Sequence, residues 1–518
     1  MLFTDPFFIF IFLPLTISGF HLFNKYSTNL ALLFLTFSSF IFYSWDQPQF
    51  IFLLLFIVLI SWYMGKLIGL STNNSDKKIL LVLSIALILV PLIYYKYFYF
   101  ITSNLPESFI TEDTLISAKS IILPIGISFY TFQAISYLVD IYSGQIKGSN
   151  NFVKYSAYVT MFPQLVAGPI VRFKEISTQL VSPRLTRDDV RIGTYFFVIG
   201  LSKKVLIADS LAPLVEMIFD GGLGNEYNFY IIAIGSIAYA LQIYFDFSGY
   251  SEMAIGIARF FGFKFPQNFN SPYKAKSLTE FWQRWHMSLS FWIRDYVYYP
   301  LLAQNLRRSM SNFSKYSPHI IAMLIFGIWH GAGWNFIIFG FMHGFYIVFF
   351  NLWSKSKAKF FNFSIFENSK FSLLMGWSIT FICVVFGWVL FRAESFEGAQ
   401  IIINAMISFD EIVLPQNIHM IKHWFSNEIF INGLYDSNFK AAIWILLLLF
   451  ISLALPNTLQ IMKKYKPALE SYIGEIVSSR NNYLQWRPIK TWALFTAVIF
   501  VLSILNISGE SEFLYFQF

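Results

Sequence analysis

His330 is the first candidate for chemistry in this sequence. It lies in the run FGIWHGAGWNFIIFGFMHG, residues 326–344, inside a largely apolar segment. Because imidazole titrates near neutral pH, a histidine at this depth is suited to act as a general base. Gly331 and Gly333 predict a bend in the segment 318–352, which would form a discontinuous helical hairpin and place His330 beside flexible backbone. The alternative is a histidine that only forms hydrogen bonds in the core.

A second histidine, His286, stands in the charged and aromatic run FPQNFNSPYKAKSLTEFWQRWHMSLSFWIRDYVYYP, residues 265–300. Glu280 and Arg284 are four residues apart, as are Trp282 and His286, which predicts two pairs on helical faces. Charged residues interleaved with tryptophan are also typical of a helix at the membrane interface, and this is the alternative.

Asp246, Ser248 and Glu252 interrupt the apolar run YFDFSGYSEMAIGIARFFGF at 244–263. Polar groups at membrane depth are costly, so they normally face a cavity or a partner. Two interpretations stay open. These side chains line a polar tunnel, or they pair with basic residues.

The sequence ends in the aromatic run FLYFQF, residues 513–518. An exposed tail of this kind would favour aggregation, so we expect it to be buried at the bilayer interface or in the protein's own tunnel. A tyrosine ester keeps a phenoxide leaving group, so Tyr515 could hold an acyl group in an activated form. The alternative is that this tail only anchors the chain at the interface.

The composition identifies the class of protein that positions these residues. Of 518 residues, 56% are hydrophobic and 13% are charged, whereas soluble domains carry about 25% charged residues. This excludes disordered chains, secreted disulfide scaffolds and ordinary soluble enzymes. The long continuous apolar segments predict an all-α polytopic membrane protein. The single Cys383 excludes an internal disulfide and a multi-thiolate metal site.

Several segments have the length and apolarity of a transmembrane helix. They are residues 6–23, 29–44, 49–65, 79–101, 371–391, 439–456 and 491–507. Apolar segments with more polar residues lie between them, at 121–140, 152–170, 190–216, 228–260 and 318–352. We expect about 10–12 crossings in total, with re-entrant segments in the middle third.

Basic loops set the expected orientation. Residues 457–490 carry six basic and two acidic side chains, and residues 353–370 carry four lysines and one glutamate. Both are therefore expected on the cytoplasmic side. The acidic segment 393–438 then lies outside, and so do both termini. The net charge of +8 is accounted for by such loops and does not require a nucleic-acid partner.

Together these runs resemble the membrane-bound O-acyltransferase (MBOAT) family. The nearest branch holds the membrane subunits that O-acetylate alginate, peptidoglycan and cellulose. The pieces that carry the resemblance are GISFYTFQAISYLVDIY at 126–142, FPQLVAGPIVRF at 162–173, YFDFSGYSEMAIG at 244–256, NFNSPYKAKSLTEFWQRWHMSLSFWIRDYVYYPL at 268–301, WHGAGWNFIIFGFMHG at 329–344 and FGWVLFRAESFEGA at 386–399. The resemblance implies an MBOAT-like helical bundle around a central tunnel.

The expected organisation follows this resemblance. It comprises N-terminal transmembrane helices (1–119), a catalytic core (120–400), an extracytoplasmic loop (401–438), C-terminal transmembrane helices (439–507) and an extracytoplasmic aromatic tail (508–518). The resemblance implies that His330 is catalytic, that His286 supports it in the tunnel and that Tyr515 carries the acyl group. The other tunnel or substrate residues that we expect are Asp246, Ser248, Gln283, Arg284, Trp285, Trp329 and Asn335.

The resemblance also implies the activity. The expected reaction moves an acetyl group from a cytoplasmic thioester, acetyl-CoA, across a bacterial inner membrane for O-acetylation of an extracytoplasmic polysaccharide such as alginate or peptidoglycan. Basic loops at 172–191 and 264–276 would attract the phosphates of the donor. An esterase-like partner with a Ser-His-Asp triad would modify the polymer outside. No permanently bound cofactor and no metal are expected.

Two alternatives remain at this point. A non-covalent transporter or flippase would also use a polar tunnel and basic cytoplasmic loops. Within the enzyme class, the chain would instead transfer a D-alanyl or another acyl group.

Overall fold

The computed structural model describes residues 1–220, 229–309, 311–360, 369–407, 438–469, 484–507 and 513–514. These residues are predominantly helical, and the only β pairing among them is an isolated bridge between Pro266 and Leu469. The all-α class expected from the long apolar segments is confirmed.

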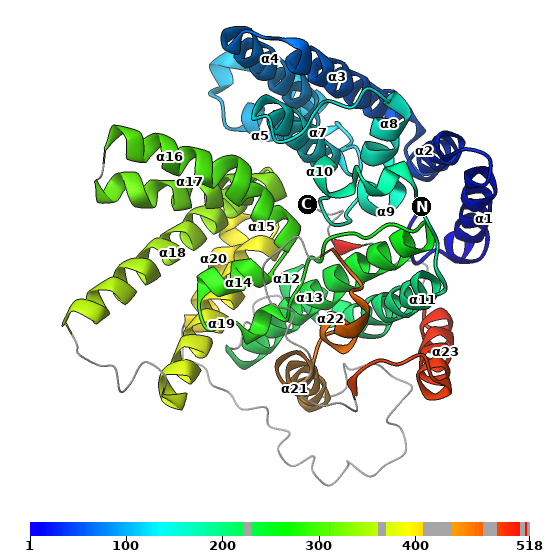
Figure 1. Ribbon diagram of the computed structural model, residues 1–518. Helices are drawn as coiled ribbons and strands as arrows, with labels where there is room; N and C mark the ends of the chain where they lie inside the picture. The colour runs from blue at the N-terminus through cyan, green and yellow to red at the C-terminus, as the bar shows by residue number, and fades with distance from the viewer. Residues whose placement is uncertain are drawn as a thin grey trace.

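The first third of the chain forms helices that lie together on one side of the molecule (Figure 1). They are α1 (Leu13–Asn24), α2 (Thr28–Ser44), α3 (Ile51–Leu70), α4 (Asn74–Leu92), α5 (Phe98–Ser103), α6 (Glu112–Lys119) and α7 (Ile127–Tyr142). A π-helical turn, Ile93–Tyr97, joins α4 to α5. Helix α3 packs against both α4 and α7.

The longest helix, α13 (Phe229–Phe260), runs through the middle of the molecule in Figure 1. The elements before it are α8 (Phe152–Thr160), α9 (Phe162–Leu165), α10 (Phe173–Ile176), α11 (Arg187–Ser202) and α12 (Asp209–Phe219). Helices α11 and α13 approach closely because glycines face each other. A Cβ on Gly249 would lie 2.6 Å from the carbonyl oxygen of Gly200. In a bilayer the hydrophobic effect does not drive helices together, so they associate through close packing, which small residues permit.

The remaining helices follow α13 in the chain. They are α14 (Leu278–Arg284), α15 (Met287–Ile293), α16 (Tyr299–Arg308), α17 (Asn312–His330), α18 (Trp334–Phe360), α19 (Lys370–Arg392), α20 (Phe396–Ile407), α21 (Asn438–Ala454), α22 (Thr458–Ile461) and α23 (Lys490–Leu505). Helices α19, α20 and α21 all pack against α13.

Five helical segments in the described part are long and apolar enough to cross a membrane. They are Pro48–Leu70, Asn74–Ser103, Ile231–Phe260, Trp334–Trp353 and Lys370–Arg392. Shorter apolar helices cover Phe8–Asn24, Thr28–Ser44, Phe396–Ile407, Lys440–Ala454 and Lys490–Leu505. Each of the clearly apolar segments expected to span the bilayer coincides with one of these helices.

The predicted break in the helix at Gly331 and Gly333 is confirmed. Helix α17 ends at His330, α18 begins at Trp334, and the two pack against each other along their lengths. Helix α20 extends across the boundary expected at residue 400, and the loop expected beyond it lies mostly outside the described residues.

Candidate active site

His330 is the last residue of α17 and is buried, with 4% of its surface exposed. Its ring centroid lies 4.7 Å from that of Phe326 on the preceding turn and 4.9 Å from that of Phe391 on α19. Gly331 continues with an extended backbone, and a Cβ there would collide with the ring of Phe336. The glycine therefore lets the start of α18 close over the end of α17.

His286 lies between α14 and α15 and is fully buried. Its backbone is left-handed, with φ 41° and ψ 54°. The next residue, Met287, donates its N–H to the carbonyl of Asn268 at 2.9 Å. On the side of α13, the ring of Phe247 meets the imidazole edge to face at 4.7 Å.

The expected helical pair of Trp282 and His286 is wrong. Helix α14 ends at Arg284, so the two side chains do not share a helical face, and Trp282 packs against Phe326 at 4.6 Å instead. The other pair is confirmed, since Arg284 binds Glu280 at 2.8 Å.

The two histidines meet inside the bundle. Their ring centroids are 6.4 Å apart, and the ring of Trp329 lies 5.8 Å from that of His286. Trp285, the residue directly after α14, is buried and packs against Trp388 of α19 at 4.7 Å. The fold thus brings the two motif runs, 268–301 and 329–344, into one aromatic enclosure with two imidazoles.

Three other expected site residues have different surroundings. Gln283 is exposed, and Arg284 also binds the carbonyl of Asn270 at 3.0 Å. Asn335 donates its side-chain amide to the carbonyls of Leu390 at 3.3 Å and Ala393 at 2.9 Å. Asn335 therefore ties the start of α18 to the end of α19.

Asp246 and Glu252 of α13 pair with basic residues. This confirms for these two side chains the interpretation that they form ion pairs. Asp246 lies 2.8 Å from Lys204, which also binds Asp209 at 2.8 Å, and Glu252 is paired with Lys203. Ser248, expected with them, is buried on the same helix.

Phe513 and Leu514, at the start of the aromatic tail, reach this part of α13. Phe513 is 2% exposed and stacks on Tyr250 with ring centroids 4.4 Å apart, and it lies 5.9 Å from Phe247. Leu514 donates its backbone N–H to Asp246 at 3.2 Å. The start of the aromatic tail is therefore held against α13, with Phe513 buried inside the protein. Tyr515 lies outside the described residues.

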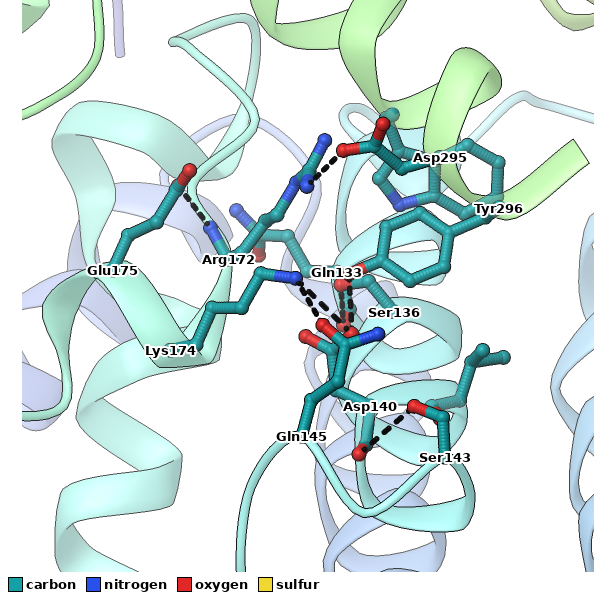
Figure 2. A network of polar contacts seen from close by, with 12 residues as sticks. Gln133, Ser136, Asp140, Ser143, Gln145, Arg172, Lys174, Glu175, Asp295 and Tyr296 are labelled. Carbon is teal, nitrogen blue, oxygen red and sulfur yellow. Dashed lines mark hydrogen bonds and ion pairs between the residues drawn. The ribbon is translucent and has the colours of Figure 1, made fainter. Parts of the chain in front are cut away.

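The basic residues after α9 are engaged in a polar network (Figure 2). Arg172 is buried and binds Asp295 at 2.7 Å, and Lys174 binds Asp140 at 3.4 Å. Tyr296 donates its hydroxyl to Asp140 at 2.8 Å. Two cations expected to attract a phosphate-bearing donor are thus already paired with carboxylates.

The carboxylates of this network have shifted pKa values. Burial raises the pKa of Glu175, and the nearby Arg172 only partly opposes this effect. Burial acts in the same direction on Asp295, but hydrogen bonds from Arg294 and Arg172 bring its pKa below the usual value. Asp295 therefore stays ionised beside two guanidinium groups.

Sequence reasoning missed two residues of this neighbourhood. Lys96 lies within the apolar segment 79–101 and contacts the end of α17, and Asp140 lies at the end of the apolar segment 121–140. The available signal was the same for both, a single charged residue in an apolar run. Among the described residues, no group of three or more His, Cys, Asp or Glu could hold a metal ion.

Comparison with known proteins gives this site its context. The sequence model of MBOAT, the membrane-bound O-acyltransferase family, matches residues 40–391. The chain belongs to this family. It is therefore a membrane-embedded O-acyltransferase, and this family assignment disfavours a non-covalent transporter.

Three relatives of this MBOAT protein differ in their named activities. It is 34% identical to a probable alginate O-acetylase of Pseudomonas putida over the full length of both chains. It is 31% identical to a peptidoglycan O-acetyltransferase of Helicobacter pylori, over 100% of this chain and 98% of the relative. It is 28% identical to a teichoic acid D-alanyltransferase of Streptococcus thermophilus, over 54% of this chain and 71% of the relative.

Proposed function

We propose that this MBOAT protein takes an acetyl group from acetyl-CoA on the cytoplasmic side of a bacterial inner membrane. It delivers that group for O-acetylation of an extracytoplasmic polysaccharide such as alginate or peptidoglycan. The observation that carries the proposal is the buried pair of His286 and His330, 6.4 Å apart, beside the docked start of the tail. The full-length similarity to an alginate and a peptidoglycan O-acetylating relative supports the acetyl group and the acceptor class.

The chemistry of the proposal needs one base. The imidazole of His330 takes the proton of an acceptor hydroxyl as its oxygen attacks the thioester carbonyl, and a tetrahedral intermediate forms. When this intermediate collapses, the C–S bond breaks and the CoA sulfur takes the proton from the imidazolium. The aromatic walls formed by Phe326, Phe391 and Trp329 exclude water, which disfavours hydrolysis of the thioester.

The acceptor in this proposal is the hydroxyl of Tyr515. Phe513 is fixed against Tyr250, and two residues of extended chain span at most about 7 Å. Tyr515 follows Phe513 by two residues in the sequence, and Phe513 packs near Phe247, the aromatic residue that contacts His286. The resulting tyrosyl ester has a phenoxide leaving group, so it can pass the acetyl group to the serine of an extracytoplasmic esterase-like partner. In this arrangement both termini face outward.

Mass spectrometry of the C-terminal peptide tests the proposal. The full-length chain in proteoliposomes is given acetyl-CoA, and wild type is compared with His330→Ala and Tyr515→Phe. We expect one acetyl group on the wild-type peptide and none on either variant. A bare wild-type peptide while acetyl transfer to polymer continues would replace the tyrosyl ester with direct transfer at His330.

The same experiment separates the acyl donors. Acetyl-CoA and a D-alanyl thioester are supplied together. The D-alanyl donor is included because a teichoic acid D-alanyltransferase is similar to about half of this chain. We expect an acetyl adduct only. A D-alanyl adduct, or no adduct and no transfer with acetyl-CoA, would contradict the acetyl donor.

A further inference from the structure

We infer that Lys96 is a positioning residue of the acyl-transfer site, which caps the carboxyl end of α17 and fixes the main chain that carries His330. The inference rests on the proposed catalytic role of His330. Lys96 itself comes from the π-helical turn between α4 and α5, in a separate part of the fold.

The contacts of Lys96 are directed at this helix end. Its Nζ lies 2.7 Å from the carbonyl oxygen of Trp329 and 2.9 Å from that of His330. The ammonium group also lies 5.9 Å from the ring centroid of Trp329 and 3.5 Å from the hydroxyl of Ser128. One cation therefore binds the main chain of the candidate base and that of its neighbour.

These contacts complete the hydrogen bonding at the end of α17. The last four carbonyls of a helix have no partner within the helix. The carbonyl of Gly327 accepts the N–H of Gly331 at 3.4 Å, and that of Ile328 accepts the hydroxyl of Tyr97 at 2.7 Å. The remaining two carbonyls are those that Lys96 binds. In a membrane, water is scarce at such a position, so a side chain must satisfy them.

The chemistry of the cap suits a lysine. The ammonium group offers three donors, and its charge complements the negative end of the helix dipole. A lysine inside an apolar membrane segment is costly, which makes a functional partner the default explanation. The π-helical turn follows Pro91 in the last turn of α4, and such turns are frequent at functional sites.

The cap matters for catalysis because the chain changes direction directly after His330. The segment between α17 and α18 contains Gly331 and Gly333, and glycine restricts the backbone dihedral angles least. The position of the imidazole then depends on how firmly its own peptide group is held. A displacement of about 1 Å at a reacting group can cost about 100-fold in rate.

Steady-state kinetics of acetyl transfer test the inference, with the full-length chain in proteoliposomes and acetyl-CoA as donor. We expect Lys96→Met to lower kcat about 100-fold while KM for the donor stays within about threefold. Lys96→Arg, which can also donate to two carbonyls, is expected to recover most of kcat. Tyr97→Phe is the matched control, because it removes a cap from the neighbouring carbonyl only, and we expect it to lower kcat less than about threefold.

Three results would overturn the inference. They are a wild-type kcat in Lys96→Met, an equal loss of kcat in Tyr97→Phe, and a loss confined to KM. If Lys96→Met does not accumulate in the membrane, Lys96→Gln, which is polar but shorter, decides in its place, and a wild-type kcat there also overturns the inference.

The result is distinguishable from a failure of the proposed function. A wild-type chain without acetyl transfer, or a fully active His330→Ala variant, would contradict the proposed function. Lys96 variants with wild-type kcat beside an inactive His330→Ala variant would contradict only the role of Lys96.

Discussion

The backbone N–H of Leu514 lies 3.2 Å from Oδ2 of Asp246, which joins the end of the chain to the middle of α13. The other carboxylate oxygen is paired with Lys204 at 2.8 Å. The next residue of the same helix, Phe247, packs against the ring of His286. Helix α13 therefore links the docking of the tail to the position of one of the two site histidines.

Removal of the Asp246 carboxylate is predicted to release the tail. Asp246→Ala loses a charge-assisted hydrogen bond to Leu514, worth about 1.5 kcal/mol or roughly tenfold in the docking equilibrium. We expect carboxypeptidase to remove the last residues about tenfold faster than in wild type, with a parallel fall in transfer. Asp209→Ala is the matched control, because it removes the other partner of Lys204 and leaves the tail contact intact. Equal digestion of both variants would contradict a tail held by Asp246.

The stacking of Phe513 on Tyr250 is predicted to supply most of the binding energy of the tail. Phe513→Ala removes a buried ring, which costs about 3 kcal/mol in well-packed sites. We expect transfer to the polymer to fall about 100-fold while KM for the donor is unchanged, because the tail and not the donor site is affected. Phe513→Leu keeps most of the apolar surface and should retain most of the rate. A Phe513→Ala variant with the wild-type rate would show that the tail does not take part in transfer.

The sequence was sufficient for the helices, because the bilayer fixes their length and composition. The helix break was also predictable, since Gly331 and Gly333 follow His330 directly in an otherwise apolar run. The ion pair of Glu280 and Arg284 followed from their spacing within one helix. All three depend on information that is local in the chain.

The features that could not be predicted from the sequence depend on contacts between segments that are distant in the chain. His286 has a left-handed backbone, so its side chain does not share a helical face with Trp282. The following residue, Met287, donates its N–H to the carbonyl of Asn268, which lies outside this helical segment. Likewise, the two carbonyls that Lys96 binds lie at the end of α17, and the side chain of Asp140 binds Lys174 and Tyr296, which come from two distant segments. A single charged residue in an apolar run signals that a partner exists, but periodicity does not identify that partner.

The ion pair of Arg172 and Asp295 is predicted to stabilise the fold rather than to bind a donor. Arg172→Met removes a buried guanidinium group, and we expect it to lower the free energy of unfolding by about 2 kcal/mol, since Asp295 keeps Arg294 as a partner. Arg191→Met breaks an exposed pair with Asp188 and should cost at most about 0.5 kcal/mol. Denaturant titration in detergent measures both. A rise in KM for acetyl-CoA at unchanged stability in Arg172→Met would instead indicate a donor contact.

The backbone of His286 allows its structural and chemical roles to be measured separately. At φ 41° and ψ 54° a side chain with a Cβ is strained by about 1 kcal/mol relative to glycine. His286→Gly is therefore predicted to unfold at a higher temperature than His286→Ala, although glycine leaves the larger cavity. Both variants lack the second imidazole, so we expect both to lose at least about tenfold in transfer rate. If His286→Ala unfolds at the higher temperature, the strain assigned to the left-handed backbone of residue 286 is contradicted. If either variant transfers acetyl groups at the wild-type rate, His286 does not support His330.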